Sequence, residues 1–161
     1  MTAARVSMGE PILTPSLIPA EFGGEQVFDC PITTDAGEFR VTALSMGNPH
    51  AVLWVEDVDA ADVETIGPLI ENHAKFPAKT NVEFAQLSGI DRFKARVWER
   101  GVGETLACGS GAAAAAALAH RRGLVGRRVT VMLPGGPLLV EVEGDRVWIE
   151  GPAVMVFRGV I

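Results

Sequence analysis

The stretch Cys108–Gly123 reads CGSGAAAAAALAHRRG, and it decides which fold we expect. Its six consecutive alanines have a high helix propensity. Arg121 and Arg122 suit the negative end of a helix, and Gly123 is typical of the position just after one. We therefore predict a helix over residues 108–122. Because this helix is apolar on nearly all sides, it should be surrounded by protein.

Short strand-like runs lie on both sides of the predicted helix. In one of them the apolar residues Phe39, Val41 and Ala43 alternate with the polar residues Arg40 and Thr42, as in a strand with two different faces. The small helical side chains would let strands approach closely. We therefore predict an α+β fold, in which a strongly bent antiparallel β-sheet or barrel wraps around a central alanine-rich helix. The strands are expected at residues 5–8, 26–30, 39–46, 51–55, 82–87, 93–98, 129–133, 138–142, 147–150 and 154–157.

Two further segments complete the predicted organisation. Helical periodicity extends from residue 59 to about His73, but Gly67-Pro68 interrupts it, so we expect two short helical pieces there. Residues 1–24 are rich in proline and glycine and predict an extended lead-in. The length of 161 residues predicts one domain, residues 1–161.

Composition excludes several classes of protein. The net charge of −6 and the isoelectric point of about 5.0 argue against nucleic-acid and membrane-surface partners, which favour a basic face. The longest apolar run, residues 112–119, is too short to span a bilayer, and the N-terminus has no apolar signal core. Two cysteines are too few for a disulfide framework. We expect a cytoplasmic protein with reduced thiols.

The loop before the alanine helix combines the features of a reactive site. It reads ERGVGETLACGSGA over residues 99–112 and leads from a predicted strand into the helix. The first N–H groups of a helix have no helical partner, so they can hold a carboxylate or phosphate. A cysteine there, Cys108, should have its thiol pKa lowered by the helix dipole. Cys108 alone would favour an inert buried thiol, but the adjacent Gly-Ser-Gly and Glu99-Arg100 favour the functional interpretation.

Other polar residues have ordinary interpretations when each is taken alone. Asn48 precedes Pro49, which holds it extended and could aim its amide, and His50 could tune or shuttle a proton. Asn81 is a candidate amide contact at the start of a strand. On spacing alone, an Asn-Pro turn with a solvated histidine better explains Asn48 and His50, and an ordinary turn asparagine better explains Asn81. No paired His or Cys spacing predicts a metal site, and no nucleotide-binding fingerprint is present.

Taken together, these motifs resemble the diaminopimelate epimerase family. The segment of residues 99–112 is similar to the second-cysteine signature of that family, which related cofactor-independent racemases share. The combination with further motifs in the same order is specific, and it covers essentially the whole chain. Those motifs are MGEP at residues 8–11, SMGNPH at 45–50, PLIENH at 68–73, FP at 76–77, NV at 81–82, LPGG at 133–136 and GPA at 151–153.

The resemblance implies an isomerase that interconverts LL- and meso-2,6-diaminopimelate in lysine and peptidoglycan precursor synthesis. One thiolate removes the α-proton and a second thiol delivers a proton to the opposite face, with no pyridoxal phosphate or metal. Cys108 would be one of these two acid/base groups. The resemblance further implies that the backbone of Gly109 and Ser110 holds the α-carboxylate, that Asn48, Asn81, Glu99 and Arg100 contact the substrate, and that Glu99 and His50 tune the cysteines.

The resemblance covers only the C-terminal half of a two-half enzyme. Cys30 does not lie in the first-half cysteine motif, because no Asn-Gly precedes it, so the first catalytic role is not assigned to it. We therefore expect the N-terminal half of the same enzyme as a partner, no epimerisation by this chain alone, and an apolar face that could drive homodimer formation. Two alternatives stay open: another cofactor-independent racemase or isomerase of the same fold, and a non-catalytic carboxylate-binding domain.

Overall fold

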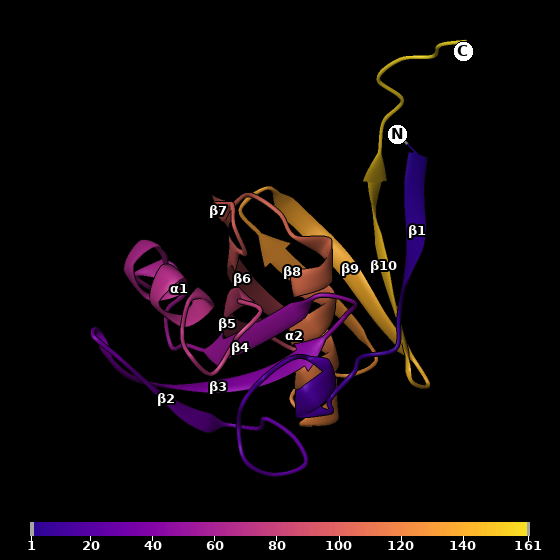
Figure 1. Ribbon diagram of the computed structural model, residues 1–161. Helices are drawn as coiled ribbons and strands as arrows, with labels where there is room; N and C mark the ends of the chain where they lie inside the picture. The colour runs from indigo at the N-terminus through magenta and orange to yellow at the C-terminus, as the bar shows by residue number, and fades with distance from the viewer. Residues whose placement is uncertain (1, 161) are drawn as a thin grey trace.

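The computed structural model describes residues 2–160, which fold into one mixed β-sheet with two α-helices and one 3-10 helix. Figure 1 shows their arrangement. The strands are β1 (Thr2–Gly9), β2 (Cys30–Thr34), β3 (Gly37–Ser45), β4 (Pro49–Trp54), β5 (Asn81–Gly89), β6 (Arg92–Glu99), β7 (Gly103–Thr105), β8 (Arg128–Leu133), β9 (Gly136–Glu143) and β10 (Arg146–Ala153). The helices are η1 (Pro15–Leu17), α1 (Val63–Glu71) and α2 (Gly109–Arg121).

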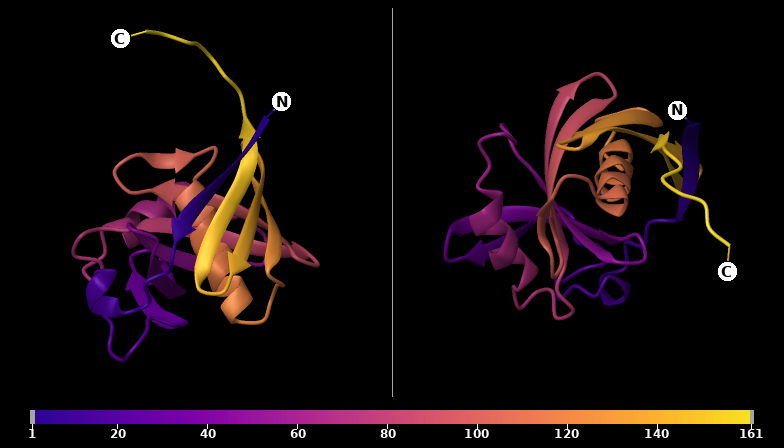
Figure 2. Two further views of the ribbon diagram at one scale, coloured as in Figure 1. Left: turned by 90° about the vertical axis from the view of Figure 1, so that its right-hand side faces the viewer. Right: turned by 90° about the horizontal axis from the view of Figure 1, so that it is seen from above.

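The sheet bends around α2, as the fold prediction required. Its strand order is β1-β10-β9-β8-β6-β5-β4-β3-β2, and β7 pairs with β6 outside this path. The view from above in Figure 2 shows the curved sheet around the helix. The prediction of an α+β fold with a bent sheet around the alanine helix is confirmed.

The expectation of a wholly antiparallel sheet is wrong at two pairings. β4 pairs with β5 in parallel, and so does β6 with β8. In both cases a helix lies between the two strands in the chain, α1 in the first case and α2 in the second. A helical crossover returns the chain to the same end of the sheet, and that makes the next strand parallel.

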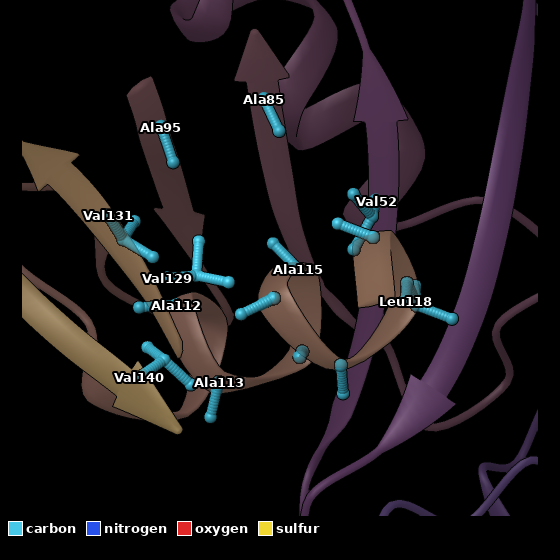
Figure 3. Close-up of a cluster of buried hydrophobic side chains, with 14 of the residues drawn as sticks. Val52, Ala85, Ala95, Ala112, Ala113, Ala115, Leu118, Val129, Val131 and Val140 are labelled. Carbon is cyan, nitrogen blue, oxygen red and sulfur yellow. The ribbon is translucent and has the colours of Figure 1, made fainter. Parts of the chain in front are cut away.

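The core around α2 depends on its small side chains. Residues 112–119 are all buried, and Figure 3 shows the helix packed among valines and alanines of the surrounding strands. A chain of alanines keeps the helix narrow, so strands on several sides approach its backbone. The strand residues of this cluster include Val52, Ala85, Ala95, Val129, Val131 and Val140.

The opposite face of the central strands packs against α1 and the loops around it. Leu53 and Phe84 lie in this second cluster, whereas their neighbours Val52 and Ala85 face α2. Successive side chains of a strand point to opposite faces, so β4 and β5 are buried on both. These doubly covered strands give the polar residues at their ends a rigid base.

Helix α1 is one continuous helix, so the prediction of two short pieces is wrong. The Asp62 side chain accepts a hydrogen bond from the Thr65 N–H at 3.2 Å and caps its start, and Pro68 lies inside it. Val63, Gly67 and Ile70 are buried against the sheet. This packing holds the helix together across the proline, which removes only one backbone donor.

The strand expected at residues 26–30 is displaced to β2, the one expected at residues 154–157 is absent from the described residues, and β7 was not expected. The run at residues 26–30 enters the sheet only at Cys30, because Asp29 has a left-handed φ of 47° and its N–H is held by the Thr42 side chain at 3.0 Å. Residues 154–157 follow the end of β10 and form no strand. β7 was missed because its three residues are polar or glycine.

The N-terminal residues take part in the sheet. β1 pairs antiparallel with β10 over most of its length and forms one edge. Within residues 2–160, no helix has both the length and the apolar character needed to cross a membrane.

Candidate active site

Cys108 occupies the N-cap position of α2. Its backbone is extended, with φ −139° and ψ 108°, and its side chain caps the helix by accepting a hydrogen bond from the Gly111 N–H at 3.3 Å. The Ser110 hydroxyl lies 3.6 Å from the same sulfur. Cys108 is 8% exposed. The predicted helix start and its end before Gly123, which has a φ of 69°, are both confirmed.

Burial, rather than the helix, dominates the protonation of this thiol. Burial raises the pKa of Cys108, while the Ser110 hydroxyl and the Gly111 N–H lower it. The carboxylates of Glu83 and Glu99 raise the pKa further. The net direction is upward, so the expectation of a lowered thiol pKa is wrong. The hydrogen-bond donors at the helix N-terminus do lower the pKa of the thiol, as expected, but desolvation of the thiolate raises it by more.

The first turn of α2 is built for close approach. The N–H groups of Gly109 and Ser110 lie at its first two positions, where a helix offers no acceptor. At Gly111 a Cβ would lie 2.8 Å from Glu83 Oε1 and 3.2 Å from Cys108 Sγ, so only glycine fits between them. The turn can therefore present its N–H groups to an anion beside the thiol.

Asn48 and His50 connect to this turn by hydrogen bonds. His50 is fully buried, its Nδ1 lies 2.6 Å from Glu83 Oε1, and its Nε2 lies 3.0 Å from Asn48 Oδ1. The Asn48 Nδ2 group donates to the Ser110 hydroxyl at 3.4 Å. The structure thus brings four predicted site residues together: Asn48, His50, Cys108 and Ser110.

Asn81 and Arg100 form a second group, which is joined to the first through Pro49. The Asn81 Nδ2 group donates to the Pro49 carbonyl at 2.9 Å, and its Oδ1 accepts from the Arg100 N–H at 2.8 Å. Both ends of the Asn81 amide therefore fix the local backbone. The exposed Arg100 guanidinium donates through Nη1 to the Ala78 carbonyl at 3.0 Å. Glu99 Oε1 accepts from the Thr105 hydroxyl at 2.5 Å.

Cys30 lies apart from these residues. It begins β2, at the opposite edge of the sheet from β1, and its thiol donates to the Phe28 carbonyl at 3.5 Å. Both cysteines are free thiols. No group of three or more His, Cys, Asp and Glu side chains arranged to hold a metal ion occurs among the residues that the structure describes.

Sequence reasoning missed two buried carboxylates at this site. Glu83 is fully buried beside His50 and Gly111. Glu71 accepts hydrogen bonds from Trp98 Nε1 at 2.7 Å and from the Gly101 N–H at 2.8 Å, and so holds the turn that follows Glu99. The available signal was a glutamate inside the apolar strand run Val82-Glu83-Phe84, because a buried charge needs a specific partner.

Solved structures share the fold at low sequence identity. A hydroxyproline epimerase from Agrobacterium vitis, crystallised with trans-4-hydroxy-L-proline, superimposes with a TM-score of 0.69 at 19% identity, over 92% of this chain and 49% of that one. A probable proline racemase from Agrobacterium radiobacter gives a TM-score of 0.64 at 18% identity, over 96% of this chain and 54% of that one. These likenesses establish the fold.

Curated relatives are much closer in sequence. The diaminopimelate epimerase of Desulfitobacterium hafniense is 50% identical over 100% of this chain, and that of Pelotomaculum thermopropionicum is 51% identical over 96%. The chain spans 57% and 56% of the length of these two relatives. The sequence pattern of the family described as diaminopimelate epimerase matches residues 42–156. The chain belongs to the diaminopimelate epimerase family.

Proposed function

We propose that this chain is the C-terminal part of a cofactor-independent epimerase that interconverts LL- and meso-2,6-diaminopimelate, a reaction of lysine and peptidoglycan precursor synthesis. One observation carries the proposal: the Cys108 sulfur lies at the N-terminus of α2, beside the first N–H groups of that helix. A thiol and an anion-binding turn are thereby adjacent. Membership of the family gives this arrangement its chemical meaning.

The geometry supports Cys108 as a proton carrier at the α-carbon. The N–H groups of Gly109 and Ser110 would hold the α-carboxylate and spread the charge that develops on the carbanion. The raised pKa of Cys108 favours the thiol, which can give its proton to that carbanion. The resulting thiolate would then be stabilised by donors from Gly111 and Ser110.

The remaining predicted residues would select the substrate and tune the site. Asn48 and Asn81 would contact the substrate as amides, and Glu99 and His50 would tune the thiols. The exposed Arg100 side chain suits a distal carboxylate, which a guanidinium can bind through two hydrogen bonds. Two carboxylates distinguish diaminopimelate from amino acids with one.

Epimerisation requires an acid/base group on each face of the α-carbon. Cys108 supplies one, and Cys30 lies apart from it on β2. We therefore place the opposing thiol in the part of the relatives that this chain does not span, and we place the substrate between the two parts. On this proposal the chain alone retains half of the substrate site and does not invert the stereocentre.

A chimera tests this proposal directly. The part of the Desulfitobacterium hafniense enzyme that aligns with this chain would be replaced by residues 1–161, and solvent deuterium incorporation into LL-diaminopimelate followed by NMR. We expect exchange and inversion by the chimera, loss of at least about a thousandfold on Cys108→Ser, and no exchange by the chain alone.

The control is Cys30→Ser in the same chimera, which should leave the exchange rate unchanged because Cys30 lies outside the site. A folded chimera that binds diaminopimelate without exchanging its α-proton would favour a non-catalytic carboxylate-binding domain. A chimera that retained full exchange after Cys108→Ser would remove the proposed role of this thiol.

A further inference from the structure

Glu83 is a buried carboxylate next to the candidate thiol, and neither the sequence motifs nor the proposed reaction accounts for it. It lies on β5 and is 0% exposed. Its Oε1 atom lies 2.6 Å from His50 Nδ1, while no donor in residues 2–160 reaches its Oε2 atom. A carboxylate in such a place is costly unless it is partnered, so its position calls for a physical reason.

The contacts of the His50 ring fit a doubly protonated imidazole beside a carboxylate. Both ring nitrogens face oxygen atoms, Nδ1 facing Glu83 and Nε2 facing Asn48 Oδ1 at 3.0 Å. The Asn48 amide is oriented by its Nδ2 group, which donates to the Ser110 hydroxyl. With this amide orientation, His50 Nε2 faces an acceptor. With a second proton on Nδ1 the ring donates to both oxygen atoms, and the pair is an imidazolium and a carboxylate.

The carboxylate of this pair is the member next to Cys108. A Cβ on Gly111 would touch both Glu83 Oε1 and Cys108 Sγ, so these atoms lie within the roughly 6 Å over which one charge shifts the protonation of another. The charged groups that act on the sulfur are Glu83 from β5 and Glu99 from the end of β6, and His50 from β4 contacts Glu83. Both carboxylates disfavour a thiolate, and the imidazolium beside Glu83 offsets part of the effect of that carboxylate.

We propose that Glu83 is a positioning residue that His50 keeps ionised, and that its charge holds Cys108 as a thiol in the resting site. The inference rests on the proposed role of Cys108 as a proton carrier. In that role the resting thiol already carries the proton that it delivers. When the substrate carboxylate and the developing carbanion occupy the first turn of α2, the donors of Gly111 and Ser110 are in place to receive the thiolate that the proton transfer leaves.

The test measures the pH dependence of Cys108 alkylation in the whole chain with Cys30→Ser as background. Iodoacetamide rates between about pH 6 and pH 10 give the midpoint of thiolate formation. We expect Glu83→Gln to move the midpoint down by roughly one unit, which makes alkylation below the midpoint about tenfold faster. The control Glu38→Gln removes an exposed carboxylate on β3 and should not move it.

A double-mutant cycle separates this mechanism from loosened packing. Without its imidazolium, the buried Glu83 carboxylate should take up a proton, so His50→Gln should lower the midpoint as Glu83→Gln does. The double variant should then match either single variant. Additive shifts, or an unchanged midpoint in Glu83→Gln, would overturn the inference.

A measurement on the chain without substitutions at His50 or Glu83 covers the case in which these variants do not fold. Nitrogen-15 NMR of histidine-labelled protein should show both His50 ring nitrogens protonated at about pH 7.5, with the half-buried His73 as an internal reference. A neutral His50 ring would overturn the inference. Failure of the chimera to exchange the α-proton, with the midpoint shift intact, would instead count against the proposed function alone.

Discussion

At the scale of single residues, contacts with opposing effects determine the protonation of the Cys108 thiol. Two donors at the start of α2 favour its thiolate, while burial and two carboxylates favour its thiol. The balance favours the thiol. A helix N-terminus therefore does not by itself make a reactive thiolate, because the same packing that forms the turn also removes water from the sulfur.

The raised pKa of Cys108 predicts a pH dependence of stability. An unfolded thiol ionises at about pH 8.5, whereas the folded thiol retains its proton to higher pH because burial raises its pKa. Below the pKa of the unfolded thiol, Cys108 is protonated in both the folded and the unfolded state. Its contribution to the free energy of unfolding is then fully present. As the pH rises through the folded pKa, the unfolded state is favoured and that contribution is lost.

Urea unfolding at about pH 7, 8, 9 and 10 checks this prediction. With Cys30→Ser as background, the free energy of unfolding should fall more steeply above about pH 8.5 than it does after Cys108→Ser. The difference between the two chains isolates the thiol from other titrating groups. Parallel curves for the two chains would show that folding leaves the protonation of this thiol unchanged.

The candidate site was predicted unevenly from the sequence, and the reason is physical. Cys108, Gly109 and Ser110 were identified because a helix start is a local feature with a local chemical consequence. The direction of the thiol pKa was not, because it depends on Glu83 and on burial by distant strands. Neither the Glu83 charge nor burial by distant strands can be recognised from the residues of the motif.

At the scale of elements, α1 packs on the sheet with Gly67 against the Trp98 side chain of β6. Gly67 lies so close to Trp98 that a Cβ would come within 2.5 Å of the indole Cγ. The same indole donates from Nε1 to Glu71 at 2.7 Å, and Glu71 also holds the Gly101 N–H. These contacts therefore connect the helix, the tryptophan and the turn after Glu99.

This packing predicts that Gly67→Ala destabilises the protein. Helix propensity alone would favour alanine by about 1 kcal/mol. The clash with Trp98 should outweigh that gain and lower the free energy of unfolding by about 1–3 kcal/mol. Urea unfolding measures it, with Gly23→Ala as the control because a Cβ there meets nothing within 4 Å. An unchanged or more stable Gly67→Ala chain would mean that α1 shifts without cost.

The elements that were predicted well from the sequence are those whose own residues specify them. The alanine run fixed α2 almost to its ends, since propensity, charge and Gly123 all agree. The parallel pairings of β4 with β5 and of β6 with β8 depend on where each helix returns the chain. The continuity of α1 through Pro68 likewise depends on what the helix packs against. Such contacts between distant segments cannot be read from local periodicity.

At the scale of the whole molecule, the part of the chain after β10 is unusually apolar and exposed. Figures 1 and 2 show it extending away from the sheet beyond β10. Val156 is 88% exposed and Phe157 is 83% exposed, and Val154, Met155 and Val160 are exposed as well. A contiguous apolar surface of this kind is typical of a contact site. Since the chain spans about 57% of the length of a curated relative, we propose that the rest of the enzyme covers this apolar surface.

If that proposal holds, the 161-residue chain on its own should self-associate through these residues. Sedimentation velocity should show a weight-average coefficient that rises with concentration, and Val156→Asp with Phe157→Asp should abolish the rise, because a charge there opposes burial in a contact. The control is Ile90→Asp with Val102→Asp, which adds the same two charges at residues that are 96% and 74% exposed and lie outside this surface. If this control suppressed association equally, net charge rather than this surface would be responsible. A chain that stays monomeric at every concentration would mean that the exposed residues have too little affinity for one another to form a contact between two copies.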